Sequence, residues 1–128
     1  MAQLTETFIR DGRTFLQGLD GAGIVSSAAL WLWARTDGAW RYVLASPLVE
    51  AGGDMPVRIA AVLATMPQGF AVDATTLRLF PPQAETIQVL HKAVQTGPGI
   101  VAMRMTGNVV NGVRIDDAYV YRLHRRAA

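Results

Sequence analysis

The chain has 128 residues, a formal net charge of +2 and no cysteine. This length is typical of one domain that buries its own core, so we expect a single domain spanning residues 1–128. The lack of cysteine excludes disulfide bonds, thiolate zinc sites and cysteine nucleophiles.

Charged residues interrupt the apolar stretches along the whole sequence. Glu6, Arg10 and Asp11 lie close to the N-terminus, where a signal peptide would need an uninterrupted apolar segment. The longest uncharged runs, residues 21–34 and 59–72, are shorter than the roughly 20 residues of a membrane-spanning helix. We therefore expect a cytoplasmic protein that does not enter a membrane.

Apolar residues recur at helical spacing from Leu4 to Leu19, which predicts an N-terminal helix that ends near Gly21. Gly12 and Gly18 lower its intrinsic helix propensity. The helix should therefore depend on docking against the rest of the domain.

Residues 24–34 and 39–48 predict two strands of a hairpin joined across Thr36-Asp37-Gly38. Both faces of this hairpin are apolar, and the turn length decides which side chains share a face. A two-residue turn makes one aromatic ladder, whereas a three-residue turn with a bulge moves Trp40 and Tyr42 to the side of Leu30 and Leu32. The ladder of the first alternative consists of Trp31, Trp33, Trp40, Tyr42 and Leu44.

The middle of the chain predicts a helix, a short strand and a second helix. Asp54 is a suitable N-cap for the first helix, which Pro67 closes. The strand covers residues 75–80, and the second helix covers residues 84–95.

The last two runs, residues 100–109 and 113–123, alternate around Asn111-Gly112, the preferred pair for a type I′ hairpin turn. A two-residue turn there pairs Arg104 with Tyr119 and places Tyr121 on the same face. The predicted fold is therefore α+β, with element order α-ββ-α-β-α-ββ, a single largely antiparallel five-stranded sheet and helices mainly on one face. The sequence does not determine the strand order.

Residues with reactive side chains do not form a recognisable catalytic or metal-binding pattern. His91 and His124 are the only histidines, and neither has a catalytic partner defined by the sequence. The acidic neighbours Asp116 and Asp117 should point to opposite faces of a strand. We expect no cofactor, no metal site and no catalytic residue.

The apolar content, 51% of residues, and the two apolar faces of the first hairpin favour a non-enzymatic protein-interaction or assembly module. The expected partner is a second copy in a homodimer, or another protein. The predicted interaction residues are Trp31, Trp33, Trp40, Tyr42, Arg104, Tyr119 and Tyr121.

An alternative function is that of a nucleic-acid-binding accessory protein. Residues 100–128 contain five basic and two acidic side chains, and basic residues supply phosphate contacts. The residues that would contact nucleic acid, beside Arg104, are Arg114, Arg122, Arg125 and Arg126. A second alternative is a small-ligand binder or enzyme that uses a pocket between the aromatic hairpin and a helix.

Overall fold

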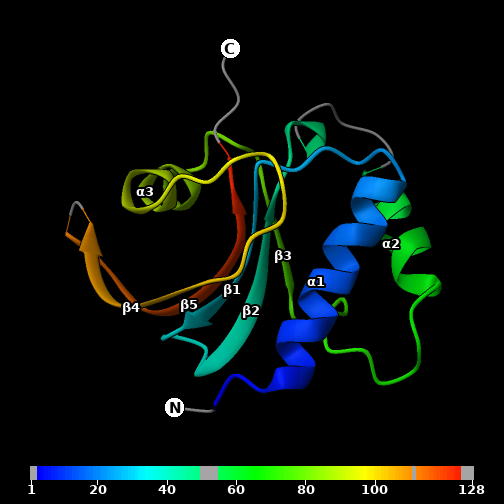
Figure 1. Ribbon diagram of the computed structural model, residues 1–128, viewed down its shortest axis with the longest axis horizontal. Helices are drawn as coiled ribbons and strands as arrows, with labels where there is room; N and C mark the ends of the chain where they lie inside the picture. The colour runs from blue at the N-terminus through cyan, green and yellow to red at the C-terminus, as the bar shows by residue number, and fades with distance from the viewer. Residues whose placement is uncertain (1–2, 50–54, 111, 125–128) are drawn as a thin grey trace.

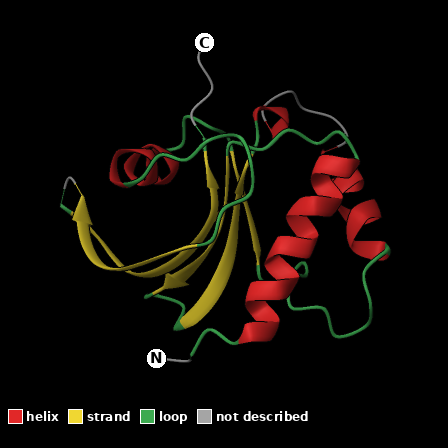
Figure 2. Cartoon of the chain, viewed as in Figure 1, coloured by secondary structure: helices red, strands yellow, loops and turns green. Residues whose placement is uncertain are grey.

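A computed structural model describes residues 3–49, 55–110 and 112–124. Its centre is one five-stranded sheet with the strand order β3-β2-β1-β5-β4, and helices lie on both sides of the sheet (Figures 1 and 2). The elements are α1 (Glu6–Gly21), β1 (Ala28–Ala34), β2 (Ala39–Ala45), η1 (Pro47–Val49), α2 (Met55–Ala64), β3 (Leu77–Phe80), α3 (Glu85–Ala93), β4 (Met103–Val110) and β5 (Val113–Leu123).

The predicted α+β class and element order are confirmed. The sheet is largely antiparallel, and its one parallel pair joins β2 to β3. β2 ends at Ala45, and Pro47 opens the short 3₁₀ turn η1, because proline cannot donate a ladder hydrogen bond. The predicted N-cap Asp54 lies outside the described residues.

The first hairpin has a four-residue loop, residues 35–38, so neither of the two predicted turn lengths is correct. Ala34 pairs with Ala39, and the Gly38 amide donates to the Ala34 carbonyl at 2.8 Å. A four-residue loop preserves the side-chain alternation of a two-residue loop but shifts the pairing by two residues. The aromatic ladder therefore forms on one face, with Trp33 opposite Trp40 and Trp31 opposite Tyr42.

The second hairpin has the predicted register on both sides of Gly107, which has no partner in the ladder. Val110 pairs with Val113 and Arg104 pairs with Tyr119. Gly112 adopts a φ of 77°, the left-handed conformation that the turn requires. The other predicted turn residue, Asn111, lies outside the described residues.

The two faces of the sheet support separate cores. α1 and α2 cover the face of the aromatic ladder, as Figure 1 shows on the right. α3 covers the opposite face, where Leu30, Ala118 and Val120 are buried. Two of the three helices thus share one face, but α3 covers the Leu30 side of β1. Both faces of β1 are therefore covered by helices of the same chain.

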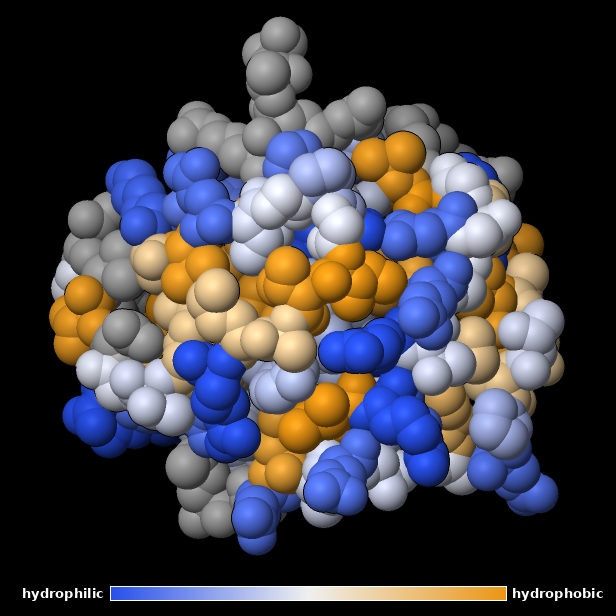
Figure 3. Space-filling model, in the orientation of Figure 1, coloured by the Kyte–Doolittle hydropathy of each residue, from blue (hydrophilic) through white to orange (hydrophobic). Residues whose placement is uncertain are grey.

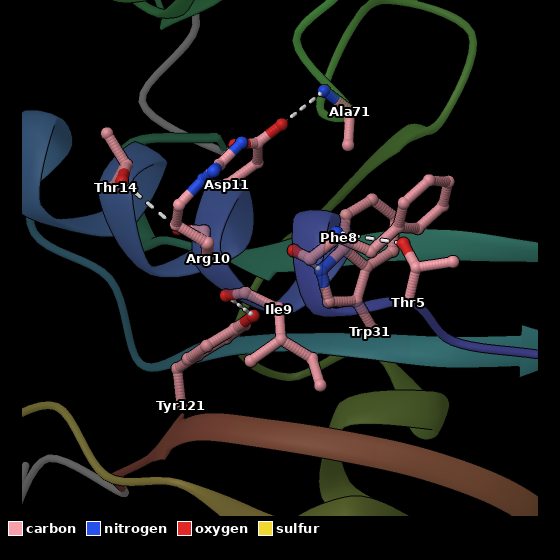
Figure 4. A network of polar contacts seen from close by, with 9 residues as sticks. All are labelled: Thr5, Phe8, Ile9, Arg10, Asp11, Thr14, Trp31, Ala71 and Tyr121. Atoms are coloured by element: carbon pink, nitrogen blue, oxygen red, sulfur yellow. Dashed lines mark hydrogen bonds and ion pairs between the residues drawn. The ribbon is translucent and has the colours of Figure 1, made fainter.

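The N-terminal helix α1 lies unusually close to the sheet at Gly12. A Cβ atom at this position would lie 2.5 Å from the Tyr121 hydroxyl and 2.6 Å from the Trp31 indole nitrogen. Both groups donate to carbonyls of α1: Trp31 Nε1 to Phe8 at 2.8 Å, and Tyr121 Oη to Ile9 (Figure 4). Tyr42 Oη donates to the carbonyl of Gly12 itself at 2.9 Å. Three buried donors are thus satisfied only because residue 12 has no side chain.

We predict that Gly12→Ala lowers the free energy of unfolding by about 1–3 kcal/mol, because the added methyl group must displace α1 from these donors. The higher helix propensity of alanine would alone predict stabilisation by about 1 kcal/mol. Gly21→Ala is the matched control, since nothing lies within 4 Å of its Cβ position. Chemical denaturation that shows equal stability of the two variants would contradict the close approach.

Burial raises the pKa of both Tyr42 and Tyr121 above the ordinary value of 10.0. The neutral phenols of the folded state therefore stabilise the protein fully below pH 10, and this contribution is lost as the pH rises further. We predict that the free energy of unfolding falls above pH 10, and falls less steeply in Tyr42→Phe. Denaturation midpoints that stay level above pH 10 would contradict this assignment.

Candidate interaction surface

Three of the predicted interaction residues, Trp31, Tyr42 and Tyr121, lie inside the domain. Each side chain is fully buried, and each donates its hydrogen bond to α1. Their function in this structure is to hold α1 on the sheet, and a partner would reach them only if α1 detached.

The four other predicted residues gather towards the β4 end of the same face, where Trp40 is buried at 5% exposure, Trp33 and Tyr119 are partly buried and Arg104 is exposed. The rings of Trp33 and Trp40 meet edge to face, with centroids 5.6 Å apart. The guanidinium carbon of Arg104 lies 5.8 Å from the centre of the Trp40 ring, and Tyr119 is the cross-strand neighbour of Arg104. Trp, Tyr and Arg are the residue types that contribute most to protein interfaces. We call this group, with Asp117, the Arg104 cluster.

Asp117 fixes the position of the Arg104 side chain. Its two carboxylate oxygens accept from Nε and Nη2 of Arg104 in a bidentate pair. The Asp117 side chain is 5% exposed and that of Arg104 is 44% exposed, so the acid is buried beneath the base. The hydrogen bonds to Asp117 raise the pKa of Arg104, although burial opposes this effect. Asp117 therefore holds the Arg104 guanidinium in a fixed position, and the ion pair as a whole has no net charge.

The sequence contained a signal for this pair that the prediction missed. Asp117 lies diagonally across the hairpin from Arg104, because the register opposes Arg104 to Tyr119. Diagonal neighbours on one face of an antiparallel pair are close enough for long side chains to meet.

The arginines predicted to contact nucleic acid are already engaged with carboxylates where the structure describes them. Arg122 is buried, and its guanidinium donates to Asp20 at 2.8 and 2.9 Å and to the Ser26 hydroxyl at 2.9 Å. Arg114 pairs with Asp116. Arg125 and Arg126 lie outside the described residues. These pairs weaken the positive field that non-specific phosphate binding requires.

The residues that could ligate a metal ion or transfer a proton lie apart from one another in the described part of the chain. They contain no group of three or more potential metal-ligating side chains. Asp116 and Asp117 bind different arginines and do not share a site. His91 is buried, with Nε2 3.4 Å from the Ser27 carbonyl, and His124 Nδ1 lies 3.3 Å from the Thr96 carbonyl. No helix in the described ranges is long and apolar enough to cross a membrane.

The edge strand β4 carries two exposed apolar side chains among its described residues. Met103 is 39% exposed and Val109 is 67% exposed. Figure 3 shows hydrophobic side chains across the middle of the molecule, over the region between the β4–β5 hairpin and α1. Strand order determines which strand is an edge, and the sequence does not provide that order.

Hydrogen-bond alternation shows which backbone groups face the open edge. Tyr42 donates its amide to Thr76 beside β3, so its backbone points away from β1. In antiparallel ladders, opposed residues point either towards each other or apart. Following the row from Tyr42 through Trp31 and Tyr119 to Arg104, the backbone N–H and C=O of Arg104 are directed outward, away from β5.

Comparisons with protein-family models, curated proteins and solved structures find no match for this chain. The candidate surface is therefore assigned from its own geometry and chemistry.

We predict that Asp117→Asn releases Arg104, because an amide supplies only one neutral acceptor to the guanidinium. The Arg104 Nε–H resonance should move towards the position of an exposed arginine, and stability should fall by about 1 kcal/mol, since Arg104 is partly solvated. Asp116→Asn is the matched control and should leave this resonance unchanged. The same spectrum for wild type and Asp117→Asn would show that Asp117 does not hold Arg104.

Proposed function

We propose that this protein is a non-enzymatic assembly module that pairs with a second copy of itself through the open edge of β4. The observation that carries the proposal is the position of Arg104. Its backbone hydrogen-bonding groups face the open edge, and its side chain is fixed in the Arg104 cluster beside that edge. One residue thus joins a strand-pairing site to a surface rich in Trp, Tyr and Arg.

The two edges of the sheet differ in their protection against pairing. β3 has only four residues, is followed by Pro81-Pro82 and carries the exposed Arg78. Short length, proline and charge are the usual ways of blocking an edge strand. β4 is twice as long, has no proline, and its only charged side chain is neutralised by Asp117. This contrast supports β4 as the edge that accepts another strand.

A second copy suits this edge because the surface is electrically neutral and can be its own complement. Antiparallel pairing of two identical edge strands is compatible with a two-fold axis, the most common symmetry of homo-oligomers. Strand addition supplies main-chain hydrogen bonds, and neighbouring side chains supply the remaining contact area. A stable interface buries about 800 Å² on each partner, so it must extend beyond the β4 strand onto the rest of the Arg104 cluster.

The experiment is sedimentation equilibrium of the wild type, Arg104→Ala and Arg104→Pro, with circular dichroism to confirm folding. Both variants remove the guanidinium, but only proline also removes the outward N–H. Proline is tolerated at this position because β4 is an edge strand. We expect a wild-type dimer, at least tenfold weaker association of Arg104→Ala, and still weaker association of Arg104→Pro.

Arg78→Ala on the opposite edge is the matched control and should dimerise as tightly as the wild type. A monomeric wild type at high concentration would contradict the proposal. So would folded Arg104→Ala and Arg104→Pro variants that both retain the wild-type dissociation constant.

A further inference from the structure

A concave site lies between the start of α3 and the curved β5. It is a half-open cavity of about 360 Å³. Its apolar lining includes Leu32 of β1, Leu90 of α3 and Ile115 of β5, and the last two side chains are almost fully buried. Figure 1 shows the β4–β5 hairpin curving around α3 on this side. This cavity contains no residue of β4, through which we propose dimerisation, although Trp33 of the Arg104 cluster also lines it.

Two arginines at the rim share a single carboxylate. Nε of Arg114 lies 2.5 Å from one oxygen of Asp116, and Nε of Arg35 lies 3.8 Å from the other. The arginine side chains are 61% and 71% exposed, whereas that of Asp116 is 19% exposed. Within the described part of the chain, neither arginine forms an ion pair with a carboxylate other than Asp116. Their terminal nitrogens are well suited to binding a second carboxylate.

Glu85, in the first turn of α3, also lines the cavity. It forms no ion pair with either arginine among the described residues, and its negative charge disfavours an anion nearby. An anionic ligand would therefore place its charge on the arginine side of the rim and its apolar part on the floor.

We propose that this cavity binds a small apolar carboxylic acid. The hydrocarbon part lies against Leu32, Leu90 and Ile115, and the carboxylate lies between Arg35 and Arg114. At about 30 Å³ for each water-sized group, the cavity holds about a dozen non-hydrogen atoms, which corresponds to a medium-chain or single-ring acid. The apolar floor disfavours a free phosphate or another small polar anion, because such a ligand would leave that floor uncovered.

The test is isothermal titration calorimetry of the full chain with octanoate and with 1-octanol, which has the same chain and no charge. We expect saturable octanoate binding, and binding of the alcohol at least tenfold weaker. Arg35→Gln and Arg114→Gln should each weaken octanoate binding at least tenfold without changing alcohol binding. Glu85→Gln should strengthen octanoate binding, and Arg58→Gln, a surface change on α2, should have no effect.

Absence of saturable octanoate binding at millimolar ligand would overturn the proposal. Equal affinity for the alcohol, or unchanged octanoate affinity in both rim variants, would also overturn it. A tripeptide such as Gly-Gly-Leu that binds more tightly than octanoate through its free C-terminus would assign the cavity to chain ends instead. Sedimentation of the two rim variants distinguishes this site from the β4 edge. Arg35→Gln and Arg114→Gln should dimerise like the wild type, although they bind octanoate weakly.

Discussion

The contact of α1 with the sheet at Gly12 organises the rest of the molecule. Three aromatic side chains of the sheet each bury a polar atom, and each atom finds its acceptor on α1. A buried donor without an acceptor costs about 1–3 kcal/mol. Detachment of α1 would therefore lower the stability of the fold by several such terms. This contact buries Trp31 and Tyr42 of the aromatic ladder, whereas Trp33, nearer the end of β1, stays partly exposed.

The arginines of the C-terminal hairpin are all paired with aspartates. Arg104, Arg114 and Arg122 each lie against an aspartate, although their sequence positions alone indicate a basic surface. Pairing removes most of the net field and leaves directional hydrogen-bond donors in fixed positions. Such a surface suits contacts with a neutral partner at β4 and with a single carboxylate at the α3 cavity, and it suits the polyanionic backbone of nucleic acid less well.

The parts of the fold that depend on local chemistry could be predicted from the sequence, and the parts that depend on long-range pairing could not. Asn-Gly defined the register of the second hairpin because a two-residue turn leaves no freedom in pairing. Asp37-Gly38 did not do the same for the first hairpin, since the same dipeptide also closes a four-residue loop. Trp31 and Trp33 share one alternating pattern, and only the placement of α1 makes one a core residue and the other part of the Arg104 cluster. The edge position of β4 likewise follows from strand order alone.

The most direct test of this account is hydrogen exchange of the Trp31 indole N–H, followed by nuclear magnetic resonance. This group is buried and donates to the Phe8 carbonyl of α1. If the α1 contact organises the fold, its exchange should require α1 to detach, and its protection should approach the free energy of global unfolding. Exchange at the rate of a solvent-exposed indole would show that α1 does not close over the aromatic ladder, and the division between core and interaction surface would then be wrong.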